Sequence, residues 1–193
     1  IHDGTVNTDL ITENGKPALY VVNQSLETTT DISLPTDLTM FYVTRKNSTS
    51  TGQSQLAVGN NIYAEGFAGR GLPQFSNLAG SAFLISSSLG NNFSMTLAAQ
   101  QKLIFSNRRG TTGACGLDGG TELTATGNLT TGVTFNRIVG TSGGFHSYNG
   151  WVQEAIFYAS DESSNRTDIE ENINSEYLIY QPTDAPTSGL LAD

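Results

Sequence analysis

Charged residues are scarce in this sequence, and the scarcity removes several classes of partner. Only 14% of the 193 residues are Asp, Glu, Lys or Arg. The chain has nine basic and 18 acidic residues, which gives a net charge of −9 at pH 7. Nucleic acids and anionic membrane surfaces are bound by clustered Lys and Arg. The one adjacent basic pair, Arg108 and Arg109, is interpreted as part of a solvated loop. We therefore expect no nucleic-acid partner.

Cysteine and long apolar runs are lacking too. Cys115 is the one cysteine, so neither a disulfide within the chain nor a thiolate zinc cluster can form, and its small neighbours favour a buried filler. The longest apolar runs, 82–85 and 155–159, fall far short of the roughly 20 residues that a membrane-spanning helix requires. We expect no insertion into a membrane.

In place of charge the chain carries Ser, Thr, Asn and 21 glycines, a composition typical of an all-β, turn-rich domain. Asp118 and Gly119 can supply the positive φ angles of a tight hairpin turn. Pro35 indicates that the stretch it ends is an edge strand. The predicted strands are 17–22, 31–35, 38–44, 55–58, 61–64, 82–86, 93–98, 102–106, 114–117, 121–126, 133–139 and 151–158.

One helix is predicted after the last strand, from residue 163 onwards. Ile169, Ile173 and Tyr177 recur every four residues and form an apolar stripe that can lie on a sheet. On the opposite side of such a helix, Glu170 and Glu171 are expected to face solvent. A single C-terminal helix in an otherwise β chain is a specific architectural feature.

Several segments resemble a known family. The run 150–158, followed by Asn165, Arg166 and 169–174, resembles the last strand and helix of laminin G-like, concanavalin A-like jelly-roll domains. Two further segments, 14–19 and 117–122, resemble the first strand and the hairpin of bacterial and phage members. The opening and closing segments are also similar to modules related to arabinofuranosidase B, which occur in phage virion and bacterial surface proteins.

The resemblance implies an all-β fold, a two-sheet antiparallel jelly-roll sandwich with one short C-terminal helix. Residues 14–180 are expected to form this domain. Residues 1–13 are expected to be an N-terminal extension or the end of a preceding segment, and 181–193 a linker to a following one. The fold does not decide the function, because it hosts lectins, glycosidases, lyases and spacers.

Binding residues are concentrated just before and within the last strand. The loop 143–150 brings together aromatic rings, a histidine and an amide, and a tryptophan follows it. Such a mixture matches the apolar faces and the hydroxyls of sugars. The candidate ligand-binding residues are Phe145, His146, Tyr148, Asn149 and Trp151. In the alternative interpretation, Phe145 and Tyr148 plug the end of the sandwich.

A catalytic role would fall on Glu154, a weak candidate. We expect it to share a strand face with Val152 and Ile156 and to be partly buried, with a perturbed pKa. Glycoside hydrolysis needs a second carboxylate roughly 5 to 10 Å away, and no partner is evident, so the structural interpretation is preferred. Calcium is left open as a cofactor, with Asp118 and Asp161 as weak candidate ligands.

The leading hypothesis is a non-catalytic, lectin-like surface module of a phage virion or an extracellular bacterial protein, which binds carbohydrate or contacts other protein chains. One alternative is a purely structural decoration or fibre module that forms a homo-oligomer through exposed strand edges. A further alternative is a glycoside hydrolase. We expect a virion or an extracellular, cell-surface location and a role in adhesion.

Overall fold

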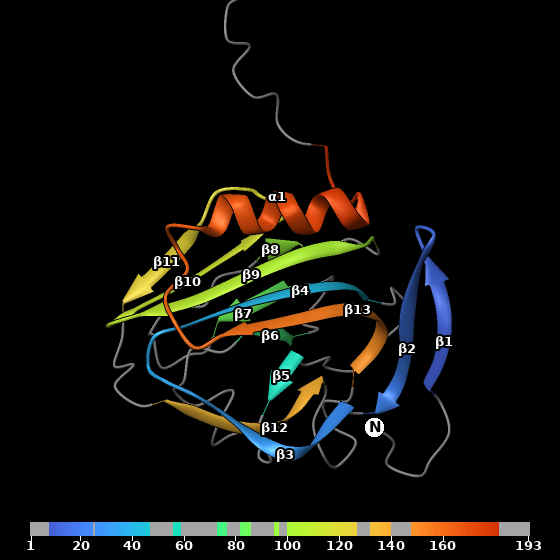
Figure 1. Ribbon diagram of the computed structural model, residues 1–193, viewed down its shortest axis with the longest axis horizontal. Helices are drawn as coiled ribbons and strands as arrows, with labels where there is room; N and C mark the ends of the chain where they lie inside the picture. Colours follow the sequence, from blue (N-terminus) through green and yellow to red (C-terminus); the bar gives the residue numbers. More distant parts are fainter. Residues whose placement is uncertain are drawn as a thin grey trace, which may run out of the picture.

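In the part of the chain that the structure describes, antiparallel sheets carry one helix, which lies on one face of the largest sheet (Figure 1). This computed structural model describes residues 8–24, 26–46, 56–58, 73–76, 82–85, 95–96, 100–126, 132–139 and 148–181. Every strand pairing within these ranges is antiparallel. The predicted class, an all-β sandwich with a short C-terminal helix, is confirmed. Among the described residues, no helix is long and apolar enough to cross a membrane.

A seven-stranded sheet forms the centre of the molecule. Its order is β1-β2-β13-β4-β9-β10-β11, made by β1 (Thr8–Glu13), β2 (Lys16–Gln24), β13 (Tyr148–Tyr158), β4 (Leu38–Lys46), β9 (Lys102–Arg109), β10 (Thr112–Leu117) and β11 (Leu123–Thr126). One three-stranded sheet has the order β3-β12-β5, from β3 (Leu26–Leu34), β12 (Val133–Val139) and β5 (Leu56–Val58). Another consists of β6 (Pro73–Ser76), β7 (Ala82–Ile85) and β8 (Met95–Thr96).

The main core lies between the seven-stranded sheet and the β3-β12-β5 sheet (Figure 1). Met40 and Tyr42 enter it from β4, while Phe135 and Val139 enter from β12, and none of the four is more than 2% exposed. The Tyr42 hydroxyl donates a hydrogen bond of 3.2 Å to the carbonyl oxygen of Ile138 and so ties the two sheets together. The interior is closed by packing of this kind between aromatic and aliphatic side chains.

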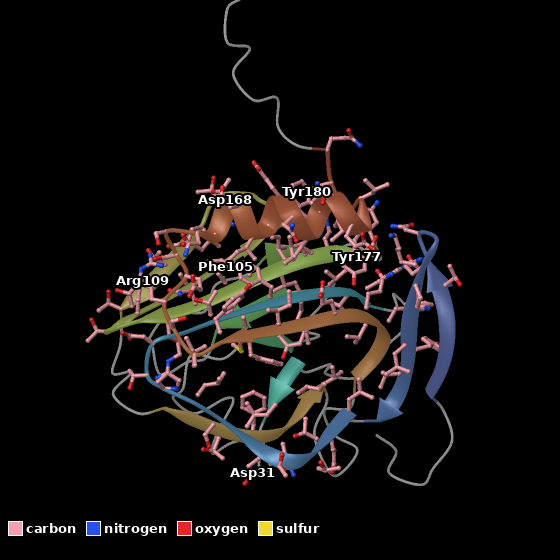
Figure 2. The ribbon with its side chains drawn as sticks, in the orientation of Figure 1. Asp31, Phe105, Arg109, Asp168, Tyr177 and Tyr180 are labelled. Atoms are coloured by element: carbon pink, nitrogen blue, oxygen red, sulfur yellow. The ribbon has the colours of Figure 1, made fainter. Side chains whose placement is uncertain are left out.

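A second apolar layer lies between the same sheet and helix α1 (Arg166–Tyr177) (Figures 1 and 2). Phe41 and Val43 of β4 and Phe105 of β9 pack there against Ile173 of the helix. Residues of β4 thus alternate between two buried faces. This explains why residues 38–44 form a nearly continuous apolar run, as expected of a strand covered on both sides. The predicted apolar stripe of the helix is confirmed.

Arg166 anchors the start of α1 on the sheet. Its guanidinium carbon lies 4.4 Å from the ring centre of Phe105, and its Nη2 donates to the carbonyl oxygen of Gly120 at 2.8 Å. Its Nε lies 3.0 Å from Glu170 Oε2. Gly116 leaves the necessary room, because a Cβ atom there would lie 2.5 Å from Arg166 Nη2.

Two charged side chains depart from the sequence-based expectation. Arg108 belongs to β9 and not to a solvated loop, and it is fully buried, because strand alternation turns it toward the main core. Its neighbour Arg109 points to the other face and pairs with Glu122. Glu170 does not face solvent, because it lies one turn after Arg166 and one turn before Ile173, on the side of α1 that faces the sheet, and it is 3% exposed. Glu171 is exposed, as expected.

The turns follow the predicted chemistry. Asp118 and Gly119 have φ angles of 51° and 70° in the β10–β11 hairpin, which confirms the predicted turn. β3 ends just before Pro35 and lies at an edge of its sheet, as predicted. The predicted strand 61–64 lies outside the described residues.

The first strand begins inside the segment expected to be an N-terminal extension. β1 pairs with β2 along its whole length, so the boundary expected after residue 13 falls within a hairpin. Asn14 and Gly15 form its turn, with φ angles of 48° and 76°. Two consecutive positive φ angles are typical of the tight turns that match strand twist. Most of the expected linker, residues 182–193, lies outside the described residues.

Candidate functional site

A β-bulge in β13 decides which side chains share a face of the central sheet. Val152 pairs with Thr44 of β4, but Glu154 pairs with Val43, so Gln153 is an extra residue in the ladder. Val152 consequently packs into the main core, whereas Glu154 lies on the side of α1. The expectation that Glu154 shares a face with Val152 is wrong, because strict alternation fails at an inserted residue.

The bulge brings Trp151 to the same side of the sheet as Glu154, and Trp151 lies between two neighbours. Tyr20 of β2 and Arg45 of β4 are its pairing partners on the adjacent strands. The Tyr20 and Trp151 ring centres are 4.8 Å apart with a tilt of 33°, and the Arg45 guanidinium carbon is 4.9 Å from the indole centre. Because these neighbours come from strands on opposite sides of β13, the indole is held between a ring and a cation.

Glu13 completes this group of side chains. Its Oε1 accepts a hydrogen bond of 2.7 Å from Arg45 Nη1. Glu13 is the last residue of β1 and lies directly before the Asn14–Gly15 turn. The Glu13 side chain is 13% exposed and that of Arg45 is 35% exposed. We refer to Glu13, Tyr20, Arg45, Trp151 and Gln153 as the Trp151 face.

A chain of amide side chains supports the Trp151 face. Gln153 Nε2 lies within hydrogen-bonding distance of the carbonyl oxygens of Glu13, Lys16 and Pro17, at 3.1, 3.4 and 3.4 Å. Gln101, which is 6% exposed, donates to Gln153 Oε1 and accepts from Asn14 Nδ2. The bulged residue is therefore fastened to the β1–β2 turn, and this contact fixes the turn relative to the sheet.

Glu154 lies beside the C-terminal end of α1. Burial raises the pKa of its carboxyl group, a hydrogen bond from the Tyr177 hydroxyl opposes this effect, and the charge of Glu176 adds to it. Tyr177 projects from the end of the helix that lies nearest the β1–β2 turn (Figure 2). Glu176 itself pairs with Lys16 at 2.5 Å. A carboxyl group with a raised pKa can act as a general acid, and it also fits a structural contact between helix and sheet.

Of the other predicted ligand-binding residues, the structure describes little. Phe145 and His146 lie outside the described residues. Tyr148 and Asn149 begin β13, where their backbones pair with Gln24 and Val22 of β2. Their prediction as ligand-binding residues is therefore not tested.

Sequence reasoning missed Tyr20, Arg45 and Glu13 as neighbours of Trp151. Strand order was the missing information, because these residues come from β2, β4 and β1, which are far apart in the sequence. The aromatic residue within the predicted strand 17–22 and the arginine that follows the strand 38–44 were visible signals. Only the pairing of both strands with β13 brings them together.

The two candidate calcium ligands have structural partners. Asp118 pairs with Lys102 at 2.5 Å and accepts a hydrogen bond from the backbone of Leu103 at 3.0 Å. Asp161 accepts hydrogen bonds from the backbone of Ser163 and from Asn107 Nδ2, at 3.0 and 2.9 Å.

Within the described part of the chain, no three His, Cys, Asp or Glu residues are grouped so that they could hold a metal ion. Burial alone would raise the pKa of Asp161. The hydrogen bonds and the charge of Arg109 outweigh burial and lower it.

Comparisons with known proteins support the fold alone. No protein-family model and no curated protein matches the sequence. Trypanosoma rangeli sialidase is similar over 91% of this chain and 29% of its own, with 12% identity and a TM-score of 0.54. A mutant of that sialidase displaying trans-sialidase activity is similar over 75% of this chain and 24% of its own, with 14% identity and a TM-score of 0.51.

A third structure, the binding domain of botulinum neurotoxin DC in complex with SialylT, has 12% identity and a TM-score of 0.45. It covers 91% of this chain and 52% of its own. This likeness is weaker than that of the two sialidase structures. The chain spans only about a quarter of the length of the sialidase chains it matches. The narrower resemblance to arabinofuranosidase-related modules stays a prediction.

Proposed function

We propose that this chain is a non-catalytic, lectin-like module that binds carbohydrate at the Trp151 face. The observation that carries the proposal is the row of Tyr20, Trp151 and Arg45 across three adjacent strands, joined to Glu13 by a hydrogen bond. All three side chains of the row are half-buried, so each is held in place and still reaches solvent.

The chemistry of the Trp151 face fits a sugar. Aromatic rings contact the apolar C–H faces of a pyranose, and hydroxyl groups need both donors and acceptors. Arg45 supplies donors and Glu13 supplies an acceptor. The Gln153 amide is engaged by Gln101 and by the β1–β2 turn, and it holds the Trp151 face in place. Because the indole lies between Tyr20 and Arg45, we expect a sugar to contact its outer edge together with these two neighbours.

The setting of the module belongs to the same proposal. We place it on a phage virion or on an extracellular bacterial surface, where it serves adhesion. The support is the resemblance of residues 14–19, 117–122 and 150–158 to modules of such proteins, together with a composition rich in Ser, Thr and Asn. Immunogold labelling of the source virion or cell would test this location.

A glycan array in the presence and in the absence of calcium tests the binding itself. Trp151 is the only tryptophan, so its fluorescence can then report the affinity for any sugar the array identifies. We expect Arg45→Gln to weaken binding about tenfold or more, because a hydrogen bond from a charged donor contributes about 1.5 to 3 kcal/mol.

Arg109→Gln is the matched control for this variant. Arg109 is also a partly exposed arginine that pairs with a glutamate, and it lies on β9, away from Trp151. Its side chain is 30% exposed, against 35% for Arg45. Equal loss of affinity in both variants, or an array without any binding, would contradict the proposal.

Glu154 supports a second candidate, glycoside hydrolysis, because its raised pKa suits a general acid. Assay of the protein on a panel of aryl glycosides tests this function. Full activity in a Glu154→Gln variant would exclude Glu154 as the acid. The structural contact of Glu154 with Tyr177 favours the binding module over the enzyme.

The outer edge of β1 supports a third candidate, a module that assembles with other chains. Within the described ranges, β1 pairs on one side alone, and a strand edge of this kind can pair with another chain. Analytical ultracentrifugation over a wide concentration range tests self-association. A protein that stays monomeric at every concentration would contradict a homo-oligomer.

A further inference from the structure

Both cations that the structure describes on and beside the Trp151 face already have a carboxylate partner. Arg45 pairs with Glu13 at 2.7 Å, and Lys16 pairs with Glu176 at 2.5 Å. Glu154 adds a third carboxyl group to this region without a described cation of its own. Among the side chains that the structure describes here, two cations therefore stand against three carboxyl groups, within a chain whose net charge is −9.

The two ion pairs differ in their accessibility. The Lys16 and Glu176 side chains are 38% and 60% exposed, so water and salt weaken their attraction. Glu13 is only 13% exposed, and the guanidinium that it contacts also lies against the indole of Trp151. The charge of Arg45 is thus neutralised by a partner that solvent reaches poorly.

A second negative charge at this place would meet Glu13. An acidic ligand that approaches Arg45 must either displace that carboxylate or lie close to it, and like charges side by side are strongly unfavourable. A hydroxyl group faces neither difficulty. It can accept from a guanidinium N–H and donate to the Glu13 carboxylate at the same time, while the ion pair stays intact.

We infer that the Trp151 face selects neutral, hydroxyl-rich sugars and rejects acidic ones, with Glu13 as the residue that determines this specificity. The inference rests on the proposed function and deepens it, because it names the chemical class of the ligand. Arg45 then donates hydrogen bonds to the sugar while its charge is neutralised by Glu13. Glu13 accepts hydrogen bonds from sugar hydroxyl groups and repels anionic ligands.

Titration of Trp151 fluorescence with matched sugars tests the inference. The probes are the methyl glycosides of glucose, galactose and mannose, each beside its uronate, in which a carboxylate replaces the hydroxymethyl group at C6. We expect at least one neutral sugar to give a saturable change and its uronate to bind at least tenfold more weakly. A uronate that binds as well as its neutral counterpart, or better, would overturn the inference and leave the proposed function standing.

If none of the six probes and no sugar on the glycan array binds, the proposed function is overturned, and this inference with it. If sugars bind but a uronate binds more tightly than its neutral counterpart, the inference is overturned and the proposed function stands. The two failures are therefore distinguishable.

The variant Glu13→Gln tests the role of the carboxylate directly. It keeps the shape of the side chain and removes the negative charge that neutralises Arg45. We expect the ratio of uronate to neutral-sugar affinity to rise tenfold or more. Glu122→Gln, which releases Arg109 in the same way, is the matched control and should leave the ratio unchanged. An unchanged ratio in Glu13→Gln would overturn the assignment of Glu13.

Salt dependence gives a test on the unaltered protein, should Glu13→Gln fold poorly. Repulsion between the uronate and the carboxylates is screened when salt rises from about 0.02 to 0.5 M. We therefore expect uronate binding to strengthen with salt while neutral-sugar binding stays constant. Uronate binding that weakens with salt would show attraction to a cation and contradict the inference.

Discussion

Arg166 carries several of the contacts that hold α1 to the sheet. It lies over Phe105, donates to the backbone of Gly120 and contacts the Glu170 carboxylate. These contacts depend on the missing side chain at residue 116. A single methyl group at Gly116 would reach the guanidinium and force it to move.

We therefore expect Gly116→Ala to lower the free energy of unfolding by about 1 to 3 kcal/mol, the usual range for overpacking. Chemical denaturation measures this change. In an Arg166→Met background the same substitution should be better tolerated, because the clashing group is gone, so a double-mutant cycle should show coupling between the two positions. Strict additivity would contradict the role given to Arg166.

Glu170 makes the stability depend on pH. Burial raises the pKa of its carboxyl group, the charges of Asp118 and Glu122 add to this, and the nearby Arg166 opposes it. A group whose pKa is higher in the folded state contributes stability below its unfolded pKa of about 4.3, and loses that contribution as the pH rises through the folded value. Ionised Glu170 is thus less favourable to folding than protonated Glu170.

The variant Glu170→Gln should accordingly gain stability relative to the native protein as the pH rises from about 4 to 7. Thermal unfolding at a series of pH values measures the difference. Asp161→Asn is the control of opposite sign, because the pKa of Asp161 is lowered and its contribution is lost as the pH falls. Parallel stability curves for native and Glu170→Gln protein would contradict the assignment.

At the scale of elements, α1 forms one wall of the second apolar layer. Ile173 is 4% exposed and packs against the side chains of β4 and β9. We expect Ile173→Ala to lower the free energy of unfolding by about 2 to 4 kcal/mol, through lost burial and the cavity left behind. The exposed neighbour Asn172, changed to Ala, should stay within about 0.5 kcal/mol of the native protein. Equal effects would show that α1 is not packed on the sheet.

Much of this element structure can be predicted from the sequence, because local patterns encode it. Alternation predicted β12, the Asp118–Gly119 pair predicted the β10–β11 turn, and four-residue spacing predicted the buried side of α1. The bulge at Gln153 could not be predicted. It depends on which strands flank β13 and on amide contacts from distant residues.

The candidate site was harder to predict than the fold for the same reason. Trp151 was identified from its own sequence neighbourhood. Its contacts with Tyr20, Arg45 and Glu13 arise from pairing between strands that are distant in the chain. Arg108 is a similar case, since composition suggests an exposed arginine and only the position of β9 in the sheet buries it.

At the scale of the whole molecule, the two faces of the seven-stranded sheet have different roles. One side closes the main core against β3 and β12, and the other side carries α1 over part of its area. Figure 1 shows the β1–β2 hairpin beyond the C-terminal end of α1, and strand pairing and the Glu13–Arg45 hydrogen bond place the Trp151 face beside that hairpin. Within the described residues, the Trp151 face therefore lies on the part of the sheet between the C-terminal end of α1 and the β1–β2 hairpin.

The most direct measurement is a two-dimensional ¹H–¹⁵N NMR titration with a sugar identified on the glycan array. The chain has one tryptophan, so the spectrum contains one indole N–H signal, and that signal reports Trp151 alone. We predict that this signal shifts in a saturable manner with the same affinity as the bulk binding. A sugar that binds the protein and leaves the indole signal unmoved would contradict the account.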